Sequence, residues 1–107
     1  MLEEKFSIPA LEQERKEIDE TFGMVTELLH GIGIEKIDKI DVEPVVAAFD
    51  YILRACGMYN DIMQQVLEKE GISTADPQSY VESKINAAYN LVKIIHDKYK
   101  HLSRWGK

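Results

Sequence analysis

The last third of the chain repeats apolar residues at steps of four and three residues, without a break. These residues are Val81, Ile85, Ala88, Val92, Ile95, Tyr99 and Leu102. A period of 3.5 residues places all of them on one side of a long helix, which must bury that side against another helix. A strand would need a period of two, so this repeat predicts a helical fold.

The middle of the chain carries the same period. Its inward side is predicted to consist of Val45, Phe49, Ile52, Cys56, Tyr59, Met63 and Val66. A second set of apolar residues runs beside the first and comprises Val46, Leu53, Met58, Ile62 and Leu67. A helix with two apolar sides is either central in the fold or shared with another chain.

A weaker apolar stripe predicts a helix near the N-terminus. Its members are Leu11, Ile18, Phe22, Val25 and Leu29, with Arg15 interrupting the repeat. Pro9 suits the first turn of this helix and Ser7 suits its cap, while Gly31 suits its end because glycine readily takes the left-handed conformation.

Start and stop signals also delimit the other two helices. Asp41 is the predicted cap of the middle helix and Gly71 its stop, and Asp76 followed by Pro77 marks the start of the last helix. The short link between these helices forces them to run antiparallel. We therefore predict one all-α domain over residues 1–107, an antiparallel up-down-up three-helix bundle with helices at about 9–30, 42–70 and 77–104.

The segment 32–41 links the first two predicted helices. Ile34, Ile37 and Ile40 recur at every third residue, a spacing typical of a short helical turn. Because the segment is apolar, we predict that it packs over one end of the bundle. Folding over the middle helix is an alternative that would cover the second apolar side of that helix.

Composition excludes several classes of function. The net charge of −6 argues against nucleic acid as the partner, and no apolar run approaches the ~20 residues of a membrane span. The acidic start of the chain does not match a secretory signal. With one cysteine, the chain forms no internal disulfide and no thiolate cage for zinc. We expect a cytoplasmic protein.

Acidic residues of the first helix offer one candidate for catalysis. Glu14, Glu17 and Glu20 are three residues apart, which matches the spacing by which all-α nucleotide pyrophosphatases bind magnesium. Such enzymes need a second acidic pair on a facing helix. The middle helix offers Asp50, which Arg54 is placed to neutralise at four residues' distance. A hydrolase of this kind is therefore the alternative and not the favoured function.

Other chemically versatile residues are predicted to be structural. Asp97 and His101 share a helix face but make too small a set for a metal, so we place them, with His96, on a solvated surface. Cys56 is predicted to be a buried thiol that reacts slowly. We expect neither a metal nor another cofactor.

Two glycines lie inside predicted helices, where each costs ~1 kcal/mol relative to alanine. They are Gly23 and Gly57, near the midpoints of the first two helices. If these helices pack antiparallel, the glycines come level and allow the two backbones to approach closely. A ligand notch at the same place is the functional alternative.

The favoured function is a non-catalytic protein–protein interaction module that self-associates. Its partner is a second copy, as a homodimer, or another protein, and not nucleic acid or a membrane. The residues predicted to make the contact are Val46, Leu53, Met58, Ile62, Leu91, Ile94 and Trp105. Trp105 supplies a large contact area, or else it folds back onto the bundle. Binding of an apolar ligand inside the bundle is a further possibility.

Overall fold

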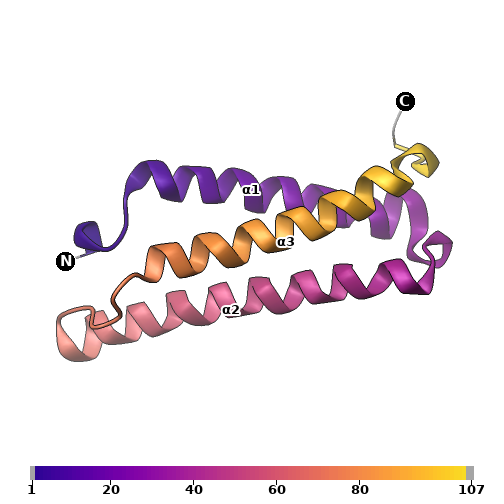
Figure 1. Ribbon diagram of the computed structural model, residues 1–107. Helices are drawn as coiled ribbons and strands as arrows, with labels where there is room; N and C mark the ends of the chain where they lie inside the picture. The colour runs from indigo at the N-terminus through magenta and orange to yellow at the C-terminus, as the bar shows by residue number, and fades with distance from the viewer. Residues whose placement is uncertain (1, 106–107) are drawn as a thin grey trace.

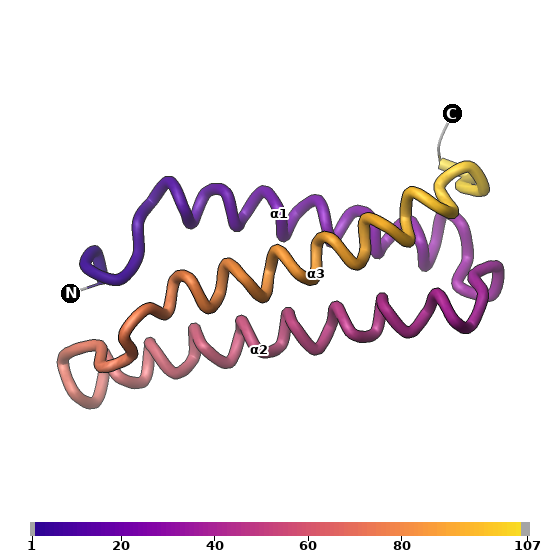
Figure 2. The backbone as a smooth tube through the Cα atoms, in the orientation of Figure 1, coloured from indigo at the N-terminus to yellow at the C-terminus, as the bar shows by residue number. Residues whose placement is uncertain are grey.

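The protein folds into three long helices in an antiparallel up-down-up arrangement, as predicted (Figures 1 and 2). The computed structural model describes residues 2–105. Its long helices are α1 (Ile8–Thr26), α2 (Lys39–Lys69) and α3 (Pro77–Tyr99). Its short helices are η1 (Leu2–Glu4), η2 (Glu27–Gly33), η3 (Ile34–Lys36) and η4 (Lys100–Leu102).

The predicted starts of α1 and α3 are confirmed. The side chain of Ser7 accepts a hydrogen bond from the backbone N–H of Ala10 at 3.3 Å. Asp76 accepts one from the N–H of Ser79 at 3.1 Å. In both helices a proline occupies the first turn, where its missing N–H leaves no unmet bond.

The boundaries of α2 differ from those predicted. The helix begins at Lys39, and Asp41 lies inside its first turn instead of capping it. Asp41 instead accepts hydrogen bonds from the hydroxyl of Tyr99 at 2.6 Å and from the ammonium of Lys98 at 2.8 Å, which ties the start of α2 to the end of α3. At the other end Glu70, and not Gly71, takes the left-handed conformation, with φ of 56°.

The chain between α1 and α2 is more helical than predicted. α1 continues into η2, a π-helix, so that helical structure runs on to Gly33. Of the three spaced isoleucines only Ile37 is buried, whereas Ile34 is 40% exposed and Ile40 is 74% exposed. The segment therefore closes one end of the bundle through Ile37 and leaves the second apolar side of α2 uncovered.

The C-terminal end turns back earlier than predicted. α3 stops at Tyr99 and not near residue 104. After η4, the backbone N–H of Arg104 donates to the carbonyl of Gly31 at 2.9 Å. The guanidinium of Arg104 donates to the carbonyl of His30 at 2.5 Å. These bonds satisfy carbonyl groups at the end of η2, and they hold the C-terminal turn against η2.

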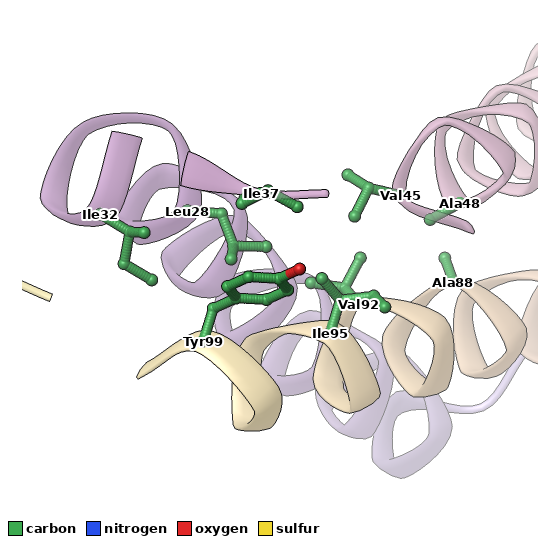
Figure 3. Close-up of a cluster of buried hydrophobic side chains, with 9 residues drawn as sticks. All are labelled: Leu28, Ile32, Ile37, Val45, Ala48, Ala88, Val92, Ile95 and Tyr99. Carbon is green, nitrogen blue, oxygen red and sulfur yellow. The ribbon is translucent and has the colours of Figure 1, made fainter. Parts of the chain in front are cut away.

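The predicted inward side of α3 is confirmed as the centre of the core. Each of its members within the helix is buried: Val81, Ile85, Ala88, Val92, Ile95 and Tyr99. The larger of two core clusters joins the C-terminal half of α3 to η2 and to the start of α2 (Figure 3). Leu28 and Ile32 contribute from η2, and Val45 and Ala48 from α2. Full burial of a side chain such as that of Leu28, Ile32 or Val45 contributes about 1.5–3 kcal/mol to the stability of the fold.

The predicted inward side of α2 is wrong for several residues. α2 buries Val45, Ala48, Ala55 and Ile62 against α3. Phe49 is 45% exposed and Met63 is 52% exposed, although both were assigned to the inward side. The reason is that small alanines let α2 lie close to α3, and the helix turns its larger side chains away from that contact.

The predicted inward side of α1 is wrong as well. Phe22 is 71% exposed and Ile18 is 40% exposed. The fully buried residues of α1 are instead Glu14 and Thr21, whose hydroxyl bonds to the carbonyl of Glu17 at 2.7 Å. α1 thus turns a partly polar face inward and leaves Phe22 and Ile18 at the surface, while Val25 of the predicted stripe is partly buried against the core.

α3 is the central helix of the fold. It packs against α2 along one side and against α1 along the other, whereas α1 and α2 do not pack along each other. Figure 1 shows α3 passing between the two. Within residues 2–105, no helix combines the length and the apolar character needed to cross a membrane.

Candidate functional site: an apolar groove between α1 and α2

The separation of α1 from α2 leaves an apolar groove of about 320 Å³, which we call the α1–α2 groove. Its walls are formed by Ile18, Phe22 and Val25 of α1 and by Phe49, Ile52 and Cys56 of α2. Ile85 and Ala88 of α3 line it as well, because α3 packs against both other helices. Large apolar side chains that are only partly buried thus converge on one hollow.

One end of the groove is closed by a polar contact between α1 and α2. Tyr59 lines the groove, and its hydroxyl donates a short hydrogen bond to Oε1 of Glu14. The ring of Phe6 stacks on that of Tyr59, with 5.8 Å between the ring centroids. Lys5 anchors the same N-terminal stretch by donating to the carbonyl of Ala75 at 3.0 Å.

Glu14 is buried to an unusual degree for a carboxyl group. It is 4% exposed, and within residues 2–105 its second oxygen, Oε2, has no hydrogen-bond partner. Burial raises the pKa of Glu14, and the nearby carboxylates of Glu82 and Glu17 raise it further, while the bond from Tyr59 opposes them. Burial and the bond to Glu14 together raise the pKa of Tyr59. The pair therefore favours a neutral phenol beside a carboxyl group that binds its proton tightly.

The three predicted metal ligands do not come together. Glu14 is buried and bonded to Tyr59, and Glu17 accepts a hydrogen bond from Gln13 at 3.3 Å. Glu20 is exposed and lines a separate shallow hollow between α1 and α3. Among residues 2–105, no set of three or more His, Cys, Asp or Glu side chains is arranged to hold a metal ion. The predicted Asp50–Arg54 ion pair is present, at 2.8 Å.

His96 was assigned to a solvated surface, which is wrong. It lies partly buried with Nε2 at 2.5 Å from Oε1 of Glu27. The other oxygen of Glu27 accepts a hydrogen bond from the hydroxyl of Ser103, also at 2.5 Å. Both bonds lower the pKa of Glu27, the one from Ser103 more strongly.

This serine, glutamate and histidine do not form a nucleophilic triad. In such a triad the histidine lies between the other two and takes the proton of the serine. Here Glu27 lies in the middle, so that His96 contacts the carboxylate and not the hydroxyl of Ser103. The network instead fastens the C-terminal turn to η2. Asp97 pairs with Lys93 and Lys100, and no contact joins it to His101 among those the structure gives.

Cys56 and the two central glycines lie where the sequence did not place them. Cys56 is exposed and lines the groove, so the prediction of a buried thiol is wrong. A methyl group added at Gly23 or Gly57 would meet no atom within 4 Å. The two glycines therefore allow no close approach between α1 and α2, contrary to the prediction. Both are exposed and follow groove residues, Phe22 and Cys56.

The residues predicted to make contacts fall into three groups: exposed, buried and partly buried. Val46, Leu53 and Ile94 are exposed by 58%, 69% and 65%. Ile62 is only 2% exposed and packs inside the protein, so it is not free to bind a partner. Met58 and Leu91 are partly buried and pack against the two core clusters.

Trp105 both folds back and stays accessible. It is 54% exposed, and its ring lies beside Gly31, where an added methyl group would come within 2.9 Å of it. Phe22 and Phe49 were missed as surface residues. Their signal in the sequence was the apolar surplus of α1 and α2, because three helices around one core do not need that many large side chains.

Comparisons of the chain with protein-family models, with curated proteins and with solved structures find no match.

Proposed function

We propose that the protein is a non-catalytic protein–protein interaction module that binds an apolar helix in the α1–α2 groove. The observation that carries the proposal is the exposure of Phe22, at 71%, beside a groove whose other walls are also apolar. Monomeric proteins seldom expose apolar patches beyond a few hundred Å², and larger ones mark sites of interaction. A helix in a groove is a common way to cover such a surface.

The shape of the groove favours a helix over an extended peptide. Its walls are themselves helices that run antiparallel, and side chains on both walls recur with the spacing of helix packing. An extended peptide would bring unpaired backbone N–H and C=O groups into an apolar surface, whereas a helix satisfies its own.

The exposed thiol of Cys56 fits a reducing compartment, which supports a cytoplasmic location.

An apolar small molecule is a second candidate occupant. The volume of about 320 Å³ lies at the lower limit of the ~300–1,000 Å³ range of ligand pockets. The two hydroxyl groups of the lining, those of Tyr59 and Thr21, are already engaged by Glu14 and by the carbonyl of Glu17. The groove therefore offers little that would orient a small molecule, and the helix remains the favoured occupant.

Site-specific photo-crosslinking in living cells tests this proposal. A benzoylphenylalanine placed at Phe22 puts a reactive group on the wall of the groove, and irradiation should link it to a polypeptide. Mass spectrometry of the adduct should map the link to a helical segment with an apolar side. The same group at Ile94, which is equally exposed but on α3, is the matched control.

The proposal expects strong crosslinking from position 22 and little from position 94. Equal crosslinking from both positions would mean that the groove has no special role. A product linked to a lipid or metabolite and not to a polypeptide would favour the small-molecule alternative and overturn the proposal.

A further inference from the structure

The exposed side of α2 carries a complete coiled-coil repeat, which we call the α2 ridge. It consists of Val46, Phe49, Leu53, Cys56, Asn60, Met63 and Leu67, and all seven residues are exposed. The steps alternate between three and four residues without a break. A second repeat, offset by one residue and including Ala48 and Ala55, already packs against α3. α2 therefore has two helix-packing sides and only one helix packed against it.

The proportions of the protein show why the ridge is left uncovered. The chain measures 50 × 25 × 17 Å, and its radius of gyration is 16.4 Å, where a compact domain of this length has ~13 Å. The three long helices make two extensive contacts, α2 with α3 and α1 with α3, so α1 and α2 each have a long helix packed along one side only. Domains normally bury their apolar sides between two layers. This one lacks much of the second.

We propose that the second layer is another copy of the same chain, with the α2 ridge of each copy inserted into the α1–α2 groove of the other about a two-fold axis. This inference rests on the proposed function and names the helix that the groove binds. The chain carries both halves of the contact, an apolar groove and an apolar ridge beside it. Under two-fold symmetry, the ridge and the groove of each copy are both covered by the other copy.

The area available is large enough for a stable dimer. The ridge spans 46–67, about 33 Å of helix at 1.5 Å per residue, and half of a cylinder ~10 Å across has a surface of about 500 Å² over that length. The α1 wall of the groove spans 18–25, about 12 Å of helix and roughly 200 Å² by the same measure, so two ridges and two α1 walls bury on the order of 1,400 Å² in total. Stable interfaces bury about 1,200–2,000 Å².

The charges beside the ridge are compatible with self-association. On α2, Asp50 is paired with Arg54 at 2.8 Å, and on α1, Asp19 is paired with Arg15 at 3.1 Å. Each of these two carboxylates is therefore neutralised within its own helix and does not itself call for a basic partner.

Gly57 beside the ridge and Asn60 within it bear on how a second helix would pack there. Glycine is unfavourable in the middle of a helix, and within residues 2–105 a methyl group added at Gly57 would meet no atom within 4 Å beyond the backbone of its own helix. A glycine beside the ridge permits a neighbouring helix to approach closely. Asn60 is the polar residue at the heart of the repeat. A single asparagine at such a position fixes the register of a helix pair at some cost in stability.

The alkylation rate of Cys56 in the full-length protein tests the inference. The thiol lies on the ridge and is exposed in one protomer, so iodoacetamide should modify it readily in dilute protein. At concentrations where nine in ten chains are dimeric, the rate should fall about tenfold by mass action. Leu53→Glu, which places a charge on the ridge, should restore fast modification at every concentration. Ile94→Glu, on α3, should behave like the wild type.

Fast modification of wild-type Cys56 at every concentration would overturn the inference of a second copy. Slow modification that Leu53→Glu does not accelerate would overturn it as well. The proposed function is judged separately by crosslinking from Phe22. An adduct to a different polypeptide, together with a freely reactive Cys56, retains the interaction module and rejects self-association. If no polypeptide adduct forms at all, both are rejected.

Discussion

The carboxyl group of Glu14 is the least expected residue in the interior. It is 4% exposed and accepts one hydrogen bond from Tyr59, and its other oxygen has no partner in the part of the chain that the structure describes. A buried carboxyl group is destabilising when ionised and much less so when protonated. Because Tyr59 also lines the groove, the state of Glu14 is linked to the wall on which a bound helix would rest.

Replacing Glu14 by glutamine should alter how stability depends on pH. The pKa of Glu14 is raised in the folded protein above the value of about 4.3 in an unfolded chain, so the fold binds this proton more tightly. Below the unfolded pKa the carboxyl is protonated in both states. As pH rises through the folded pKa, its ionisation destabilises the fold. Glu14→Gln should therefore be more stable than the wild type at about pH 8, with the advantage vanishing near pH 4.

Urea unfolding of both proteins across this pH range measures the difference. Glu20→Gln, at an exposed position of the same helix, is the matched control and should show a much smaller change. A difference between Glu14→Gln and wild type that stays constant from acid to alkaline pH would mean that Glu14 does not bind its proton more tightly in the fold.

At the scale of the helix, η2 holds two adjacent leucines in opposite environments. Leu28 is 1% exposed and belongs to the main core cluster, whereas Leu29 is 44% exposed. Leu28→Ala should therefore lower the free energy of unfolding by about 2–5 kcal/mol, the range for large-to-small changes in a core. Leu29→Ala should cost less than about 1 kcal/mol, as surface changes usually do.

Chemical denaturation of the two variants in dilute protein compares these costs directly. Dilution keeps any effect of self-association out of the measurement. Similar losses for both variants, or a larger loss for Leu29→Ala, would place the wrong face of this helix in the core.

The same pair of leucines shows how far the sequence predicts the fold. The period of α3 predicted its buried side correctly, because large branched residues such as Val81 and Val92 occupy it throughout. The stripe predicted for α1 instead took in Leu29 and omitted Leu28. That prediction assumed that the most apolar side of the helix faces inward, whereas the buried side of α1 includes Glu14 and Thr21.

For α2 the ambiguity has a simpler physical origin. Its two apolar repeats are offset by one residue, so the helical period fits both equally well. The repeat that packs on α3 contains Ala48 and Ala55, which bury little area but allow close approach. The other repeat contains Phe49 and Leu53, which are larger and more apolar and therefore dominate the pattern in the sequence.

The groove depends on which repeat of α2 faces α3, so it was not predictable from either helix alone. The surplus of apolar residues indicated a second side of α2 that includes Val46 and Leu53, and the structure leaves both exposed. The hollow beside them requires the relative placement of three helices, which follows from tertiary packing. The link between Glu14 and Tyr59, which are 45 residues apart, has the same origin.

At the scale of the whole molecule, the protomer resembles one part of a larger bundle. It is long and thin, and α3 is covered on two sides while α1 and α2 keep large apolar residues in contact with water. The Tyr99–Asp41 and Ser103–Glu27 bonds secure the end of the molecule at which η2 meets α3. The middle of the molecule, at the groove, lacks a comparable cover. In the dimer that we propose, a second copy supplies that cover.

The mass of the protein in solution tests this account most directly. Light scattering over a range of concentrations should give twice the chain mass of 12.3 kDa for the wild type and for Ile94→Glu, with dissociation on dilution. Leu53→Glu should remain at 12.3 kDa throughout while keeping its helical circular dichroism, because the change lies at a surface position. A wild-type mass of 12.3 kDa at every concentration would contradict the account.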